Sequence, residues 1–281
     1  MTPRERYLET ILFGRPDRIP FSPGVPREST LRRWHAEGLP DGDWFSHLCR
    51  EIGILCERDT GAQPDVSFRM VPAFEEKVVG RAGGHLVVQD WMGNILEISD
   101  QYDFTYLREA KDFVTRRWLK FPVTCRADFE EMKRRYDPEE PLRYPADFGR
   151  RRADLKHRRH LTRVVVPGPF WQMREWCGFE PLCLLFLDDP SFIEEMTAFW
   201  SEFVSRVLRR VLDAGILDVL LISEDMAYKG RSMVSPDTAR RHLLPVWKRW
   251  ASEARQAGVP VVMLDSDGWV DELIPLWIEA G

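Results

Sequence analysis

Acidic residues follow two apolar runs in the second half of the chain, each at the point where the run ends. Glu224 and Asp225 follow the run DVLLIS, and Asp265 and Asp267 follow the run VPVVML. If both runs are parallel strands of one sheet, their carboxyl ends share an edge and the four carboxylates converge there. Carboxylates held close together raise at least one pKa, which places a proton donor beside a proton acceptor. We therefore predict these four acids as the catalytic residues.

The same acids allow two other interpretations. Hard divalent cations prefer carboxylate oxygens, so Asp265, Asp267 and Glu224 are the candidate ligands if a metal is bound. Acidic residues after a strand also commonly cap the next helix, and Asp267 before Gly268 fits that role well. The chain contains neither a G-x-G-x-x-G nor a G-x-x-x-x-G-K-[ST] motif. We therefore expect no organic cofactor and leave a divalent metal open.

Cationic and aromatic side chains lie close to the acids along the sequence. Guanidinium and ammonium groups bind carboxylates, and aromatic rings form the walls of pockets for flat ligands. Alternatively, the cationic side chains belong to a solvated loop and the aromatic rings pack in the core, without contact to a substrate. The residues that we predict to contact a flat, anionic substrate are Arg27, Phe170, Trp171, Tyr228, Lys229 and Arg231.

The elements that must position these residues alternate between strands and helices. The apolar runs LTRVVVPG, DVLLIS and VPVVML have strand length, and the near absence of polar alternation in the first predicts a strand covered on both faces. Apolar residues at helical spacing fill 190–214 and 236–257, and a last helix is expected over 270–280. This alternation predicts a parallel sheet with right-handed connections.

The first half of the chain is less regular. We expect a helix over 3–13, a short strand over 18–22, and strands with hairpins over 67–98, one of them turning at Met92-Gly93. Residues 103–160 are rich in proline and charge and form a long irregular excursion. Lys and Arg exceed Asp and Glu between residues 116 and 163, which indicates either a solvated helix face or a rim that attracts anions.

Length and composition set the class of protein. The chain has 281 residues, 44% of them hydrophobic, which suffices for one domain of barrel size and excludes bulk disorder. Its net charge of −5 argues against a nucleic-acid partner, and no apolar run approaches the roughly 20 residues that span a bilayer. Five scattered cysteines suit a reduced compartment. We expect a cytoplasmic protein without nucleic-acid or membrane partners, and leave a homodimer open.

Three segments resemble the uroporphyrinogen decarboxylase superfamily. They are RERYLETILFGRPDRIP at 4–20, VPGPF at 166–170, and DSDG at 265–268 with the LIP and EAG that follow it. The resemblance implies a single (β/α)8 TIM barrel domain over residues 1–281 with the excursion described above. Because we count about five parallel strands and a strand should follow Gly281, we expect the barrel to be incomplete, with its last strands missing.

The superfamily contains two well-known chemistries. The decarboxylases remove acetate carboxyls from a tetrapyrrole without a cofactor and hold it with an arginine pair after the first strand, where this sequence has only Arg27. The corrinoid methyltransferases bind zinc partly through His-x-Cys, where this sequence has Asp265-x-Asp267. The resemblance thus implies a carboxy-lyase that decarboxylates a tetrapyrrole-like or other flat anionic substrate. The alternatives are a corrinoid-dependent methyltransferase-like protein with an altered metal site and a non-catalytic ligand-binding barrel.

Overall fold

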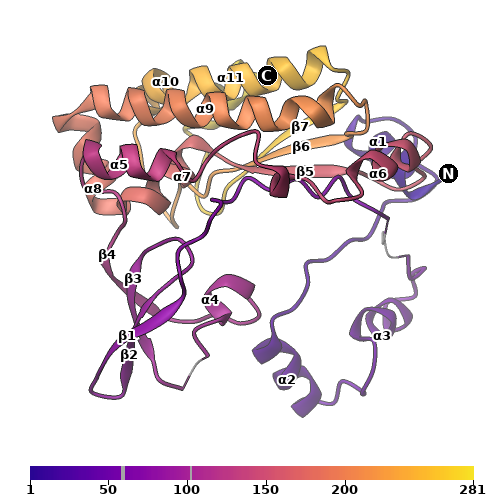
Figure 1. Cartoon of the computed structure of the whole chain (residues 1–281). Coiled ribbons are helices and arrows are strands. Elements are labelled where there is room, and N and C mark those ends of the chain that lie inside the picture. The colour runs from indigo at the N-terminus through magenta and orange to yellow at the C-terminus, as the bar shows by residue number, and fades with distance from the viewer. Residues whose placement is uncertain (58–60, 102) are drawn as a thin grey trace. The chain divides into compact units, whose positions relative to one another are not determined.

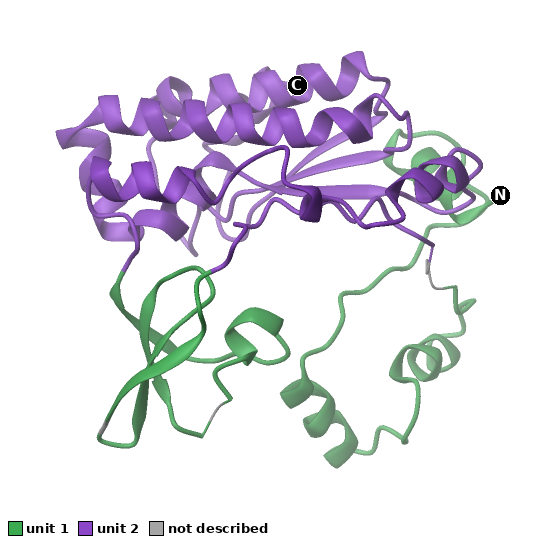
Figure 2. Cartoon of the chain, in the orientation of Figure 1, with its two compact units in different colours: residues 1–60, 74–120 green, residues 61–73, 121–281 purple. Residues whose placement is uncertain are grey.

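The computed structural model describes residues 1–57, 61–101 and 103–281, and the chain divides into two compact units (Figures 1 and 2). Unit 1 comprises Met1–Thr60 and Phe74–Lys120, and unit 2 comprises Gly61–Ala73 and Phe121–Gly281. The chain therefore contributes residues 61–73 to unit 2, returns to unit 1, and completes unit 2 from residue 121 onward.

Unit 1 contains an antiparallel sheet in the order β1-β2-β3-β4. Its strands are β1 (Lys77–Ala82), β2 (His85–Gln89), β3 (Ile95–Ser99) and β4 (Arg116–Lys120). Alternate residues of β2 and β3 are buried, as expected for strands with one covered face. The hairpin expected at Met92-Gly93 is confirmed, and the Asp90 carboxylate accepts the N–H groups of Met92 at 3.0 Å and Asn94 at 2.8 Å across the turn.

The helices of unit 1 are α1 (Pro3–Ile11), α2 (Glu28–Ala36), α3 (Trp44–Glu51) and the short α4 (Tyr106–Glu109). A capping box starts α1: the Thr2 hydroxyl accepts the N–H of Glu5, and the Glu5 carboxylate accepts the N–H of Thr2. The buried Arg6 guanidinium donates to Asp17 at 2.6 Å and to Glu57 at 2.7 Å. These ion pairs tie the segment after α1 back onto the helix.

Unit 2 is built on a parallel sheet in the order β5-β6-β7 (Figure 1). Its strands are β5 (Arg163–Pro167), β6 (Val219–Ser223) and β7 (Val261–Asp265). Helices α9 and α11 run along one face, where Val164 and Val166 of β5 are buried. The helices are α5 (Arg126–Lys133), α6 (Phe148–Leu155), α7 (Pro169–Cys177), α8 (Phe179–Asp188), α9 (Pro190–Leu212), α10 (Pro236–His242), α11 (Leu244–Gln256) and α12 (Ile274–Ala280), with a 3-10 turn η1 (Pro141–Arg143).

The expected (β/α)8 TIM barrel is wrong. Within the described ranges, three strands form the parallel sheet and four form a separate antiparallel sheet. The tight turns between β1, β2 and β3 permit antiparallel pairing only, because parallel neighbours need a crossover of a dozen or more residues. The strand expected over 18–22 is absent from that described segment, where Pro20 lacks an N–H for a ladder. The prediction that β5 is covered on both faces also fails, since Val165 is 46% exposed.

A proline divides the helix that the sequence predicts over 236–257. The structure has α10 ending at His242 and α11 beginning at Leu244, with Pro245 in the first turn of α11. Proline has no N–H to donate and its ring clashes with the carbonyl four residues earlier, so an uninterrupted helix cannot pass through it. The result is two helices where the sequence predicts one.

A buried ion pair fixes the amino ends of β5 and β6. The Asp218 carboxylate, which is fully buried, accepts from Arg158 at 2.6 and 2.9 Å. It also accepts the N–H of Thr162 at 3.0 Å, and the Thr162 hydroxyl donates to the carbonyl of Ile216 at 2.6 Å. Asp218 directly precedes β6 and Thr162 directly precedes β5, so these contacts set the register in which the parallel sheet begins.

Residues 61–73 are held in unit 2 by a buried cation. The Arg143 guanidinium is fully buried and donates to the carbonyl oxygens of Arg69 at 2.7 Å and Asp137 at 2.6 Å. Its carbon lies 4.5 Å from the ring centroid of Phe203 in α9. The N–H of Ser67 donates in turn to the Arg143 carbonyl at 2.8 Å. Arg143 thereby joins the early segment, the turn before α6 and α9.

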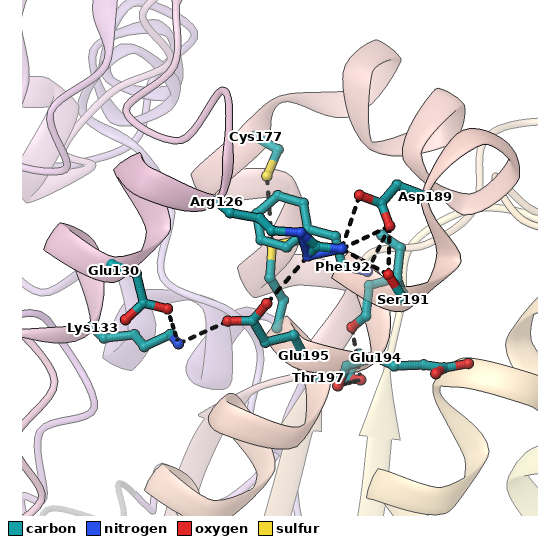
Figure 3. A network of polar contacts seen from close by, with 12 residues as sticks. Arg126, Glu130, Lys133, Cys177, Asp189, Ser191, Phe192, Glu194, Glu195 and Thr197 are labelled. Atoms are coloured by element: carbon teal, nitrogen blue, oxygen red, sulfur yellow. Dashed lines mark hydrogen bonds and ion pairs between the residues drawn. The ribbon is translucent and has the colours of Figure 1, made fainter.

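A polar network links α5 to the start of α9 (Figure 3). Arg126 donates to Asp189 at 2.8 Å, to the hydroxyl of Ser191 at 2.7 Å and to Glu195 at 3.2 Å. Lys133 donates to Glu195 at 2.8 Å. Asp189 also caps α9 by accepting the N–H of Phe192, as its position before Pro190 predicts. None of the described helices, including the longest, α9, combines the length and the apolar character needed to cross a bilayer.

Candidate functional site

The carboxyl ends of β5, β6 and β7 form one edge of the parallel sheet. Pro167, Ser223 and Asp265 are paired in register there. Beyond them the N–H of Gly168 donates to the Ser223 carbonyl at 2.7 Å, and the N–H of Glu224 donates to the Asp265 carbonyl at 2.9 Å. The structure therefore brings the backbones of the two predicted acidic pairs side by side.

Glu224 is sealed inside this edge. Its Oε2 accepts the backbone N–H of Trp171 in α7 at 3.0 Å, and its Oε1 accepts the indole N–H of Trp247 in α11 at 2.5 Å. The side chain is fully buried, and that burial raises the pKa of Glu224 to about 7 although its N–H donors and the nearby Arg174 favour the charged form. Glu224 thus fastens α7 and α11 to the end of β6, and its catalytic role stays a prediction.

A glycine makes room for the Glu224 carboxyl group. Gly168 is the residue before α7, and Pro169 takes the first helical position, where a missing N–H has no cost. A Cβ atom on Gly168 would lie 2.0 Å from Cδ of Glu224. The φ of Gly168 is −66°, which any residue adopts, so the close approach and not the backbone angle requires glycine here.

Asp225 joins the loops after β6 and β7. Its φ of +41° lies in the left-handed region, where residues with a side chain are strained unless, like Asp, they tolerate it. Its Oδ1 accepts the N–H of Asp267 at 3.2 Å, and the N–H of Met226 donates to the Ser266 hydroxyl at 3.0 Å. Glu224 and Asp225 therefore both bind backbone N–H groups, which is the capping interpretation for this pair.

The carboxylates of the second pair are differently placed. Asp265 and Asp267 are exposed, and neither side chain takes part in a hydrogen bond or ion pair with another residue that the structure describes. Their oxygens remain available to a ligand at the edge where the strands end. Of the four predicted acids, these two have exposed side chains, whereas Asp225 is half-buried and Glu224 is fully buried.

Arg174 is a site residue that the sequence interpretation missed. Its Nη1 donates to the Asp225 carbonyl at 2.7 Å, and its guanidinium carbon lies 4.7 Å from the ring centroid of Trp171. The signal was present in the sequence, because residues three apart on a helix lie on the same face. Phe170, predicted as a pocket wall, is fully buried, and Trp171 is half-buried.

The loop after β6 folds into a small hairpin. Ala227 and Ser232 form an antiparallel bridge, and the N–H of Tyr228 donates to the Arg231 carbonyl at 2.9 Å. Tyr228, Lys229 and Arg231 have exposed side chains. The Tyr228 carbonyl accepts the N–H of Trp269 at 2.9 Å, which brings a further exposed aromatic residue to this hairpin.

The last predicted substrate-binding residue is part of the other compact unit. Arg27 belongs to unit 1, where it is the residue before α2. Its guanidinium carbon lies 5.5 Å from the ring centroid of Phe113, and its Nη1 donates to the Ala110 carbonyl at 3.5 Å. Its role in substrate binding stays a prediction.

No group of three or more His, Cys, Asp or Glu side chains within residues 1–57, 61–101 and 103–281 is arranged to hold a metal ion. Of the three candidate ligands, Glu224 has both oxygens occupied by N–H donors. Asp265 and Asp267 offer two carboxylates, and a hard cation such as Ca²⁺ takes six to eight oxygen ligands. Any metal here would therefore depend on water or a ligand for most of its coordination.

No protein-family model and no curated protein matches the chain. Among solved structures, a methyltransferase from Methanosarcina mazei is similar with a TM-score of 0.41 and 17% sequence identity over 64% of this chain. The similar region covers 54% of that methyltransferase, so this chain spans about half of its length. A likeness this low supports no argument about function, and the resemblance to the uroporphyrinogen decarboxylase superfamily stays a prediction.

Proposed function

We propose that the carboxyl edge of β5, β6 and β7 binds a planar small molecule that carries carboxylate groups and N–H donors. The observation that supports this most is the state of Arg174. Its hydrogen bonds to described residues go to the Asp225 carbonyl and the Met233 sulfur, and none goes to a carboxylate. A guanidinium is always charged and offers five N–H donors in a rigid fork, so a ligand carboxylate fits the donors that remain.

Trp171 and the exposed acids complete the proposed site. The half-buried indole beneath Arg174 offers a flat surface on which a planar ligand can stack. Asp265 and Asp267 are acceptors when ionised, so they suit amine or pyrrole N–H groups on the same ligand. The site thus combines a cation for the acidic groups of the ligand with carboxylates for its N–H groups.

The reaction we propose for this site is decarboxylation without a cofactor. For an acetate side chain, a proton adds to a ring carbon, the bond between the side-chain CH2 and the carboxyl carbon breaks, CO2 leaves, and the electron pair forms a double bond between the CH2 carbon and the protonated ring. A second proton then adds to that CH2 carbon to give a methyl group, and the ring releases the first proton. Asp265 and Asp267 are the accessible carboxyls that can exchange this proton with water. The sequence resemblance to the decarboxylases supports this choice, and the sealed Glu224 has no part in the proton transfer.

A binding experiment tests the ligand class. Uroporphyrin, a planar tetrapyrrole that carries carboxylate groups, would be titrated against the full chain while tryptophan fluorescence is followed. We expect Arg174→Gln to weaken binding by about 10-fold or more, since hydrogen bonds between charged groups contribute that much. Arg209→Gln is the matched control, because Arg209 is exposed on α9 away from the strand ends. Equal affinity of Arg174→Gln and wild type would overturn the proposal.

A second experiment tests the reaction. Uroporphyrinogen would be incubated with wild type, Asp265→Asn and Asp267→Asn, and products with fewer carboxylates would be separated. The exposed Asp213 at the end of α9 supplies the control Asp213→Asn. Turnover that survives both aspartate substitutions would remove their role. Tight binding without any turnover would leave a ligand-binding protein, and stoichiometric zinc in the purified chain would favour methyl transfer.

A further inference from the structure

Glu224 lies between two N–H donors, so its position requires a side chain with two hydrogen-bond acceptors. One oxygen faces the backbone N–H of Trp171 and the other faces the indole N–H of Trp247. A carboxylate satisfies both donors at once, whereas a glutamine amide would turn its NH2 toward one of them. Because the side chain is fully buried, no water replaces a lost partner without rearrangement.

We infer that Glu224 is the positioning residue of the proposed ligand site and that Trp247 holds it in place from α11. Neither residue contacts the ligand in this arrangement. The inference rests on the proposed function for the identity of the ligand, but its structural part can be measured without one.

The contacts of the first turn of α7 carry the argument. Glu224 fixes the N–H of Trp171, and the next residue, Asp225, accepts the hydrogen bond of Arg174 through its carbonyl. Trp171 and Arg174, which stack on each other, are therefore each held by a hydrogen bond to one of two adjacent residues at the end of β6. The position of Glu224 therefore sets the positions of the Trp171 indole and the Arg174 guanidinium at the strand edge.

Trp247 makes this arrangement depend on α11. Its indole is 1% exposed and its N–H hydrogen bond to Glu224 is charge-assisted, a type about twice as strong as a neutral one. Its ring meets that of Trp277 in α12 edge to face, with centroids 6.5 Å apart. Removal of this one N–H would free Oε1 of Glu224 and let the carboxyl group leave the first turn of α7.

The chain supplies a matched control on the same helix. Trp250 is also fully buried in α11, and its indole N–H donates to the Ser201 carbonyl at 3.2 Å. Trp247→Phe and Trp250→Phe each delete one buried indole hydrogen bond and a similar volume. Only the first of the two deletes a contact to Glu224, so global destabilisation should be comparable while the effect on α7 should differ.

Two readouts test the inference: amide hydrogen exchange of residues 170–174 without ligand, and the dissociation constant for uroporphyrin. We expect Trp247→Phe to speed exchange in that segment and to weaken binding by about 10-fold, and Trp250→Phe to do neither. Glu224→Gln should behave like Trp247→Phe.

The outcomes separate this inference from the proposed function. Equal exchange of residues 170–174 in both tryptophan variants would overturn the positioning role. Accelerated exchange in Trp247→Phe alone supports it even if wild type fails to bind uroporphyrin, and that failure would then count against the ligand class only. Accelerated exchange with unchanged uroporphyrin affinity would show that the first turn of α7 does not set the affinity, and would overturn the inference.

Discussion

Replacement of Gly168 by alanine adds one methyl group at the most crowded point of the strand edge. The added carbon would lie 2.0 Å from Cδ of Glu224 and 2.3 and 2.4 Å from its oxygens. Non-bonded carbon atoms rest about 3.5–4.0 Å apart, so the Glu224 carboxyl group must move by more than about 1 Å. The φ of −66° suits alanine, and the cost is therefore purely steric.

The magnitude follows from the contacts that this displacement breaks. Overpacking of a buried site costs about 1–3 kcal/mol, and each buried N–H donor left without a partner costs about 1–3 kcal/mol more. Glu224 has two such donors, the N–H of Trp171 and the indole N–H of Trp247. If the displacement breaks one of these two contacts, Gly168→Ala should lower the free energy of unfolding by about 2–6 kcal/mol.

Urea unfolding followed by far-ultraviolet circular dichroism measures this difference. Gly230→Ala is the control, since a Cβ there meets no atom within 4 Å, and its effect should stay within about 0.5 kcal/mol. A double-mutant cycle with Glu224→Ala sharpens the test, because Gly168→Ala should cost little once the glutamate side chain is gone. The same cost in both backgrounds, or no cost in the wild type, would refute the steric reasoning.

Three further predictions concern other polar groups of unit 2. Burial raises the pKa of Glu224 from its ordinary 4.5 to about 7, so the folded chain keeps this proton to higher pH than the unfolded chain. The stabilisation that this proton provides is complete below pH 4.5 and is lost as the pH rises through 7. Between about pH 6 and pH 8, the free energy of unfolding of wild type should fall by about 1 kcal/mol relative to that of Glu224→Gln, as measured by urea titration. Asp218→Asn should cost about 3–5 kcal/mol in thermal or urea unfolding because it leaves the buried Arg158 without a counter-charge, and a cost below about 1 kcal/mol would contradict this. Asp225→Val should cost more than Asp225→Asn by about 1–2 kcal/mol, since asparagine tolerates the left-handed φ of +41° and valine does not, and equal stabilities would contradict the strain argument.

The second half of the fold was predictable because its signals are local. The runs that became β5, β6 and β7 are apolar and are separated by segments with helical spacing, and proline or glycine marks most boundaries. The shared edge at Glu224 and Asp265 followed from the geometry of parallel strands alone. The prediction of a barrel failed because closure of a barrel depends on contacts between segments that are distant in the sequence. The alternating pattern of β2 and β3 reflects an antiparallel sheet of hairpins instead.

The candidate site was predictable in its location but not in its roles. Sequence spacing places Glu224 and Asp225 at the strand end, but it does not show that their oxygens are taken by the N–H groups of Trp171 and Asp267. That depends on the path of α7, which only the folded chain reveals. The spacing between Trp171 and Arg174 could have predicted that they share a helix face, but the contact of Arg174 with Asp225 could not be predicted, since the two lie far apart in the sequence.

The division of unit 2 into two pieces has a consequence for limited proteolysis. Residues 74–120, with the whole antiparallel sheet, interrupt a body whose other pieces are 61–73 and 121–281. The short piece is retained by the Arg143 guanidinium through the carbonyl of Arg69 and by the N–H of Ser67. A protease that cuts the hairpin region would thus leave a non-covalent complex, in which the fragment that runs from Met1 to the cut co-purifies with the parallel sheet until a denaturant releases it.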